Sequence, residues 1–159
     1  MNFRIGSGFD VHKICPGKGM YLGGAFIPEE ISLVGHSDAD VLIHAICDAI
    51  YGALAKGDIG VHFPDSLEEN RGRSSSEFLK HATGLLNEKK YTISNLDTTI
   101  ICEKPKITPH REAIRSSLSK IMKLSIDQIS VKATTTEKLG FSGRGEGIAA
   151  AAHILIFQH

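Results

Sequence analysis

The stretch His36-Ser-Asp-Ala-Asp-Val-Leu-Ile-His44, which runs on to Asp48, decides how the rest of the chain is arranged. Apolar residues recur through it at helical spacing, which predicts an amphipathic helix over residues 38–54. Asp40, His44 and Asp48 are spaced i, i+4 and i+8, so they share one stripe of that helix. A histidine flanked by carboxylates one turn away is typical of a metal site whose outer residues orient the imidazole. The same triplet also suits a solvated helix face.

Length and composition predict one domain over residues 1–159, long enough for a core without disulfides. Lys plus Arg and Asp plus Glu number 18 each, so no overall field favours nucleic acid or an anionic membrane. Cys15, Cys47 and Cys102 are odd in number and widely spaced, which indicates free thiols in a reducing compartment. No stretch approaches the ~20 apolar residues of a membrane span, and a strand-like pattern begins by residue 3. We therefore expect a soluble, cytoplasmic protein.

Asp10-Val-His12 follows residues 3–9, which are predicted as a short strand. Residues two apart in an extended segment point to the same side, so both side chains can reach one point. With His44 they make three ligands of the kind that zinc takes at a catalytic site, leaving the fourth position open. Alone, Asp-x-His is more typical of a polar surface turn.

The remaining elements are predicted from apolar periodicity and end signals. Ser37 is the expected N-cap of the first helix, and a capping box at Ser74–Glu77 opens the second. Thr108 is the expected N-cap of the third helix, with Pro109 at N1. The expected strands are 3–9, 20–27, 96–102, 129–134 and 148–157. The last is predicted to be buried on both faces, which suggests cover by another subunit, although an Ala-rich helix also fits its periodicity.

Two glycine-rich loops suit a phosphate-bearing ligand. Residues 56–65 carry glycines on either side of Asp58-Ile59, so they can offer backbone N–H groups to a hydroxyl or phosphate, or serve only as a helix connector. Residues 134–147 place three threonines and a carboxylate at a strand end, followed by glycines around an arginine. Glu137 there offers hard oxygen to magnesium or manganese, and Thr135 can donate to a phosphoryl oxygen.

The chain resembles the 2-C-methyl-D-erythritol 2,4-cyclodiphosphate synthase family over essentially its whole length. The motifs that carry the resemblance occur in order, and the last is the most specific. They are Phe9-Asp-Val-His12, His36-Ser-Asp-x-Asp40, His44-Ala, Gly57-Asp-Ile-Gly60, Phe63-Pro-Asp65, Lys106 and Thr134-Thr-Thr-Glu-Lys-Leu-Gly-Phe-x-Gly-Arg-x-Glu-Gly147. The resemblance implies an α/β fold of the α+β two-layer type, with a mixed four- to five-stranded sheet and helices on one face. It also implies a homotrimer with active sites between subunits.

The resemblance further implies a role for individual residues. The metal ligands would be Asp10, His12 and His44 for zinc and Glu137 for magnesium or manganese. His36 and Thr135 would stabilise charge that develops at the transferring phosphoryl group. The substrate contacts would be Ser37, Asp58, Ile59, Gly60, Phe63, Pro64, Asp65, Cys102, Lys106, Thr108, Thr134, Thr136, Phe141 and Arg144, with a cytidine pocket at 102–108 and 134–137.

The implied reaction converts 4-diphosphocytidyl-2-C-methyl-D-erythritol 2-phosphate to the cyclic diphosphate with release of CMP, in the non-mevalonate isoprenoid pathway. The substrate's own 2-phosphate is the nucleophile, so no Ser or Cys nucleophile is required. A zinc-dependent nucleotide-diphosphate hydrolase would share the metal and phosphate contacts but would use water and release a linear product. A non-catalytic nucleotide-binding module is the other alternative. The convergence of the three expected zinc ligands argues against it, because such a module would not need them.

Overall fold

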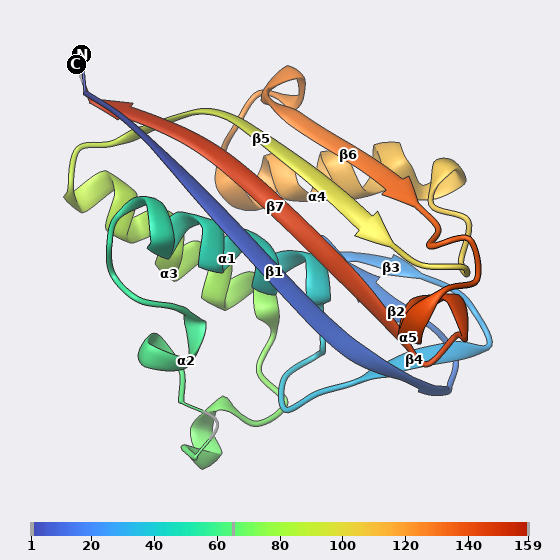
Figure 1. The fold of residues 1–159 in the computed structure, drawn as a ribbon. Helices are drawn as coiled ribbons and strands as arrows, with labels where there is room; N and C mark the ends of the chain where they lie inside the picture. The colour runs from blue at the N-terminus through green and yellow to red at the C-terminus, as the bar shows by residue number, and fades with distance from the viewer. Residues whose placement is uncertain (1, 65, 159) are drawn as a thin grey trace.

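The computed structural model describes residues 2–64 and 66–158 and shows a sheet covered by helices on one side (Figure 1). The strands are β1 (Asn2–Pro16), β2 (Met20–Leu22), β3 (Ala25–Ile27), β4 (Ile31–Val34), β5 (Thr92–Ile101), β6 (Ile129–Thr134) and β7 (Gly147–Gln158). The helices are α1 (Val41–Ala53), α2 (Ile59–His62), α3 (Ser75–Glu88), α4 (Arg111–Met122) and α5 (Gly140–Gly143). Short 3₁₀ segments are η1 (Glu68–Asn70), η2 (Thr108–His110) and η3 (Ile126–Gln128).

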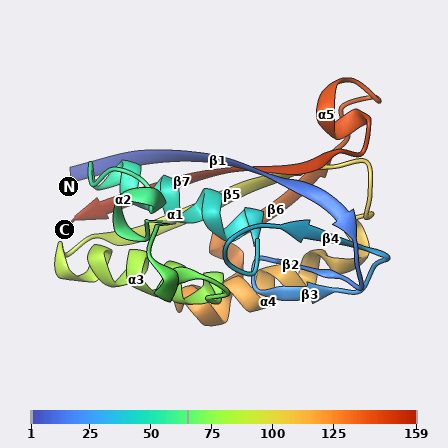
Figure 2. The same ribbon diagram turned by 90° about the horizontal axis from the view of Figure 1, so that it is seen from below.

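The main sheet has the order β4-β1-β7-β5-β6, with β5 and β6 parallel and every other neighbouring pair antiparallel. Figure 2 shows the two layers from the side, with α1, α3 and α4 below the sheet and α5 projecting from one end. The β2–β3 hairpin forms a separate small sheet in the helical layer. The predicted mixed sheet with helices on one face is confirmed.

Helix α1 lies at the centre of the core, and nearly all of its side chains are buried. Its N-cap is Asp40, whose Oδ1 accepts the N–H of Ile43 at 3.0 Å. The helix therefore begins at Val41, and the prediction of Ser37 as its N-cap is wrong. Asp40 takes that place because its completely buried carboxylate also accepts the N–H groups of Gly23 and Gly24, at 2.9 and 2.7 Å.

Two glycines let β1 approach α1 more closely than any side chain would permit. A Cβ added at Gly6 would lie 1.8 Å from the carbonyl oxygen of Ala49, and one added at Gly8 would lie 1.9 Å from that of Ala45. The strand backbone is thus in direct contact with the helix backbone along this line. Glycine is required here for close approach and not for a special φ angle.

Several predicted boundaries differ from the structure for local reasons. Ser74 precedes α3 but makes no side-chain cap bond, and Glu77 instead pairs with Arg73 at 2.7 Å. Thr108 lies in η2 with no capping bond, and α4 follows it with His110 at the N-cap position. Strand 20–27 is split into a hairpin by Gly23 and Gly24, which both have positive φ and form its two-residue turn. β1 runs on to Pro16, and β4 was not predicted.

The last strand, β7, is central in the sheet as its composition indicates. Its side chains at 148, 150, 152, 154 and 156 are buried against the helices. The opposite face carries the exposed His153, so burial on both faces is not present within one chain. Cys47 and Cys102 are buried and, like Cys15, are free thiols. In the described part of the chain, no helix combines the length and apolar character that a membrane span requires.

The close contact between β1 and α1 makes a prediction about stability. We expect Gly8→Ala to lower the free energy of unfolding by about 3 kcal/mol or more, because the added methyl meets helix backbone that cannot move aside. Gly84→Ala in α3 is the matched control, because nothing lies within 4 Å of its added Cβ. That change should raise stability by about 0.5–1 kcal/mol. Urea unfolding of both variants measures this, and equal midpoints would contradict it.

Candidate metal centre and phosphate pocket

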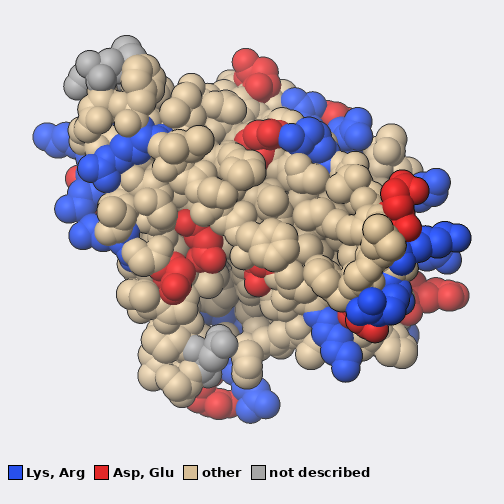
Figure 3. All heavy atoms as spheres, in the orientation of Figure 1, with Lys and Arg blue, Asp and Glu red and all other residues tan. Residues whose placement is uncertain are grey.

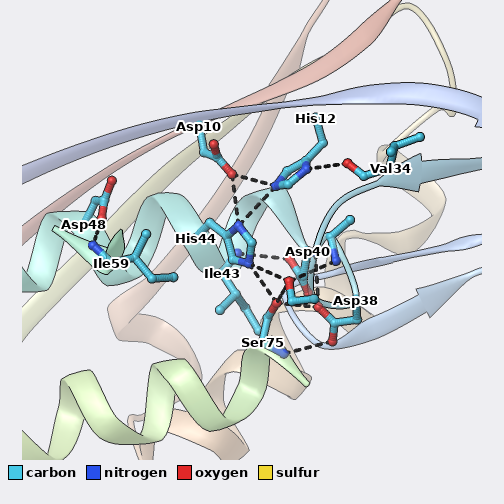
Figure 4. A network of polar contacts seen from close by, with 12 residues as sticks. Asp10, His12, Val34, Asp38, Asp40, Ile43, His44, Asp48, Ile59 and Ser75 are labelled. Carbon is cyan, nitrogen blue, oxygen red and sulfur yellow. Dashed lines mark hydrogen bonds and ion pairs between the residues drawn. The ribbon is translucent and has the colours of Figure 1, made fainter. Parts of the chain in front are cut away.

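Three side chains from two elements converge on one point between β1 and the helical layer (Figure 4). Asp10 and His12 project from the same side of β1, and His44 comes from the first turn of α1. Asp10 Oδ2 lies 2.9 Å from His12 Nε2 and 3.2 Å from His44 Nδ1. The two imidazole nitrogens are 3.1 Å apart. The structure therefore brings together all three residues that the sequence predicts as a ligand set.

The hydrogen bond that His12 makes outside the cluster determines its tautomer. Its Nδ1 lies 2.8 Å from the carbonyl oxygen of Val34, which can only accept a hydrogen bond. Nδ1 therefore carries the proton, and in the neutral ring Nε2 presents its lone pair toward Asp10. The unpredicted strand β4 thus supplies the group that orients this imidazole, as outer partners of metal-binding histidines commonly do.

His44 is oriented by hydroxyl groups rather than by the carboxylates that flank it in sequence. Its Nε2 lies 3.0 Å from Ser75 Oγ and 3.1 Å from Ser37 Oγ. Asp40 points away to cap α1, and Asp48 accepts the N–H of Ile59 at 2.8 Å. The prediction that these two carboxylates orient His44 is therefore wrong, because each is already committed to backbone N–H groups.

The cluster has the electrostatics of a cation site. Burial raises the pKa of Asp10, but hydrogen bonds and charges from His12 and His44 outweigh it and hold that pKa well below its usual range. Burial lowers the pKa of His12, and its bonds to Asp10 and Val34 outweigh that effect, so the net pKa is raised. Without a cation, three acceptor atoms that face one another would repel, so one ring nitrogen would have to turn an N–H toward Asp10.

The donor set fits a tetrahedral divalent metal. The three donor atoms are 2.9–3.2 Å apart. A tetrahedron with metal–ligand bonds of about 2.05 Å has an edge of roughly 3.3 Å, so a small expansion is all that binding requires. One carboxylate and two neutral imidazoles are ligands typical of catalytic sites that keep one position open.

A cavity of about 760 Å³ opens in front of this cluster. Of the predicted substrate and catalytic residues, it is lined by His36, Ser37, Ile59, Gly60 and Phe63 in addition to the three ligands. The sequence did not single out its other lining residues, which are Val34, Gly35, Asn70, Arg71, Gly72 and Phe78. The available signal was the polar composition of residues 70–76, with Asn, Arg, Gly and three serines, which suits an ordinary linker as well as a loop over a site.

Two aspartate side chains fix the position of the segment that carries Ile59 and Gly60. Asp58 caps α2 through its own side chain, and Asp48 accepts the N–H of Ile59. Burial raises the pKa of Asp48 although this bond opposes the shift. His62 stacks on Tyr51 with ring centroids 4.1 Å apart. These contacts place backbone at the rim of the cavity. The Pro64 carbonyl accepts from Asn70 beside it at 2.9 Å, and Asp65 lies outside the described residues.

The other predicted site residues form a second cluster, where β5 and β6 end and α5 precedes β7. Among the described residues, none from 102–108 or 134–144 lines the metal cavity. Glu137 accepts from Thr135 Oγ1 at 3.2 Å, and the N–H groups of Thr136 and Lys138 reach Glu103. Thr134, Lys106, Thr108, Phe141 and Arg144 are exposed, and Arg144 pairs with Glu146. The Cys102 thiol points inward to the Pro105 carbonyl, and burial raises its pKa to about 11.

The fold and the ligand cluster together define an α+β enzyme of the metal-binding class. A family model described as the YgbB family matches residues 3–157. The 2-C-methyl-D-erythritol 2,4-cyclodiphosphate synthase of Cereibacter sphaeroides is 54% identical over 158 residues, which cover 99% of each chain. This chain belongs to the YgbB family.

Solved structures agree with that assignment. The structure described as IspF of Plasmodium falciparum in a CDP complex has a TM-score of 0.88 and 38% identity, covering 99% of this chain and 97% of that one. The bifunctional IspDF of Campylobacter jejuni has a TM-score of 0.95 and 37% identity over 99% of this chain. The chain spans 43% of that longer protein.

The ligand cluster makes a prediction about metal content. The protein should retain one divalent ion per chain after dialysis, and Asp10→Asn should lose it, because an amide cannot supply the only anionic ligand. The core does not depend on Asp10, so circular dichroism should be unchanged. His110→Ala, which alters a histidine of η2 outside the cluster, should keep its metal. Elemental analysis decides the point, and stoichiometric metal in Asp10→Asn would refute the assignment.

Proposed function

We propose that this chain converts 4-diphosphocytidyl-2-C-methyl-D-erythritol 2-phosphate to 2-C-methyl-D-erythritol 2,4-cyclodiphosphate with release of CMP, in non-mevalonate isoprenoid biosynthesis. The observation that carries the proposal is the convergence of Asp10, His12 and His44 at a cavity, in a chain that matches its family from residue 3 to residue 157. A cyclising phosphorus–oxygen lyase of this kind needs no protein nucleophile. The free thiols Cys47 and Cys102 are buried and so play no such part.

The proposed metals are zinc at the three-ligand cluster and magnesium or manganese at Glu137. Zinc would act as a Lewis acid and polarise the phosphoryl group that reacts. The second ion would neutralise charge on the phosphates. The protein's contribution is to hold two mutually repelling phosphates in line, and positioning of this kind can supply about 7–11 kcal/mol. His36 at the cavity rim and Thr135 would stabilise charge at the transferring group.

The substrate is proposed to lie along the cavity from the metal toward the second cluster. Ser37 and the backbone of Ile59 and Gly60 would contact its phosphate and erythritol hydroxyls, with Asp58 accepting from one hydroxyl. Phe63, Pro64 and Asp65 would line the same side. The cytidine end would be held at Cys102–Thr108 and Thr134–Glu137, mainly by backbone groups because the Cys102 thiol points inward. Lys106, Phe141 and Arg144 would complete the contacts.

A homotrimer would bring the two clusters together. Within one chain they are separate, and the face of the sheet without helices is apolar along β1, where Phe3, Ile5, Phe9 and Val11 are 55, 75, 59 and 40% exposed. Figure 3 views this face, and uncharged atoms cover much of its middle. An exposed apolar patch of this kind marks an interface. We therefore propose that three copies pack through this face, each joining its metal cavity to a neighbour's cytidine pocket.

The location that we propose is the cytoplasm, because a reducing compartment suits three free cysteines in the described chain. The zinc-dependent hydrolase remains as the contrasting reaction. It would use the same ligands and would differ only in the nucleophile, so the product distinguishes the two. We expect no role for nucleic acid or a membrane surface, because the net formal charge is zero.

The reaction itself is the first prediction from this proposal. Phosphorus NMR of the purified protein with the diphosphocytidyl substrate, zinc and magnesium should show the cyclic diphosphate and CMP appearing together. Asp10→Asn and His44→Ala should each reduce turnover at least about 100-fold with the fold intact, while His110→Ala turns over normally. A linear phosphorylated product with CMP would replace the proposal with the hydrolase. Wild-type cyclisation by either ligand variant would overturn the metal assignment.

Assembly through the open face is the second prediction. Phe9→Asp places a charge among exposed apolar side chains that the trimer would bury, so it should yield monomers with unchanged secondary structure and without turnover. Lys80→Glu on α3, in the helical layer, is the control and should remain trimeric. Sedimentation equilibrium measures the mass. A trimeric Phe9→Asp variant would show that a different surface joins the copies.

A further inference from the structure

Ser75, the first residue of α3, lies where the metal cluster meets the rim of the cavity. Its side chain is completely buried, which is unusual for a serine in the first turn of a helix. The hydroxyl lies 3.0 Å from His44 Nε2 and makes a very short hydrogen bond to Asp38 Oδ1. The backbone N–H of the same residue donates to Asp38 Oδ2 at 3.0 Å. Figure 4 shows these contacts as one network.

The direction of each hydrogen bond in this network follows from the groups present. An ionised carboxylate can only accept, so both oxygens of Asp38 accept from Ser75, one from its hydroxyl and one from its backbone N–H. The single hydroxyl proton is then used. The lone pair of the Ser75 oxygen must therefore accept from His44, which places a proton on Nε2. In the neutral ring, Nδ1 is left with its lone pair directed at Asp10 and His12.

Asp38 and Ser75 belong to the two segments that form the cavity rim, and these segments are joined by backbone hydrogen bonds. The backbone N–H of Asp38 donates to the carbonyl of Arg73 at 3.2 Å, and Gly72 donates to the carbonyl of His36 at 2.7 Å. Backbone hydrogen bonds at residues 36 and 38 therefore join the loop that carries Ser37 to the 70–75 segment. Ser75 is the point at which this joined rim contacts a metal ligand.

We propose that Asp38 and Ser75 are positioning residues that set the His44 tautomer for metal binding and transmit metal occupancy to the cavity rim. The inference rests on the metal-dependent function proposed above and adds two residues that touch neither metal nor substrate. A cation on Nδ1 makes the Nε2–H a stronger donor, which strengthens the bond to Ser75 and, through Asp38, orders the rim. An outer partner of this kind is commonly worth a 10–100-fold change in metal affinity.

Two substitutions act on different parts of the network. Ser75→Ala removes the acceptor and leaves His44 Nε2 with only Ser37. Asp38→Asn keeps the size of the side chain but reverses the proton order, because an amide NH₂ facing Ser75 Oγ donates to it. The serine proton then turns toward His44 Nε2, so the neutral ring carries its proton on Nδ1, and the nitrogen that faces the metal has no lone pair to offer. Ser76→Ala is the matched control, since that hydroxyl contacts Ser74 and lies one residue along the same helix.

The test measures zinc affinity of the full chain by competition with a chromophoric chelator, independently of turnover. We expect Ser75→Ala and Asp38→Asn to bind zinc about 10–100-fold more weakly than the wild type, with Ser76→Ala unchanged. Hydrogen exchange of residues 34–38 and 70–75 should slow on zinc addition in the wild type and in Ser76→Ala, and should respond little in the other two.

The outcomes separate this inference from the proposed function. Wild-type zinc affinity in both network variants, or a rim whose exchange ignores zinc in the wild-type protein, overturns the positioning role. A wild-type protein that binds no zinc overturns it as well. Tight zinc binding with the expected variant effects but no cyclic product upholds the inference and removes the proposed reaction instead.

Discussion

The backbone contact between β1 and α1 is the constraint on which the site depends. Residues 6, 8, 10 and 12 all project from one side of β1, toward the helical layer. The first two are glycines, and the strand touches the helix backbone there at Ala49 and Ala45. The next two are Asp10 and His12, which lie beside the first turn of the helix and contact His44 there. A side chain at Gly8 would push β1 away from α1 and so move Asp10 and His12 away from His44.

Aspartates that are close in sequence have unrelated functions because their neighbours in space differ. Asp40 caps α1 and binds the Gly23-Gly24 turn, so it fixes where the helix begins and hence where His44 lies. Asp38, two residues earlier, contacts α3 instead. Asp48, two turns further on, holds the loop at Ile59. Of the carboxylates near His44 in the described part of the chain, only Asp10 is left to face a cation, so the three-residue ligand set would carry a charge of minus one.

The sequence predicts what depends on local periodicity and fails where contacts are distant along the chain. The Asp10/His12 alternation and the apolar stripe of α1 are local, so the sequence correctly predicts that Asp10, His12 and His44 lie together. The pattern of β6 is local too, and its predicted bounds are confirmed. Both Ser37 and Asp40 are good N-cap residues, and the choice between them is made by glycine N–H groups about 17 residues away. The Ser75–Asp38 contact spans 37 residues, and Val34 acts through a carbonyl oxygen that no side-chain pattern reveals.

The cavity carries little positive charge of its own, so a metal ion at the cluster would supply the attraction for phosphate. Among the described lining residues, Arg71 is the only lysine or arginine, and it is exposed and already paired with Glu68. A divalent ion held by one carboxylate and two neutral imidazoles would leave a net charge of about +1 at the cavity floor. Ile59 and Gly60 line the same cavity, so their backbone would share a bound phosphate with that charge. A chain with no net charge can in this way bind a substrate with several phosphates without a basic surface, because the cation is placed only where the phosphoryl group reacts.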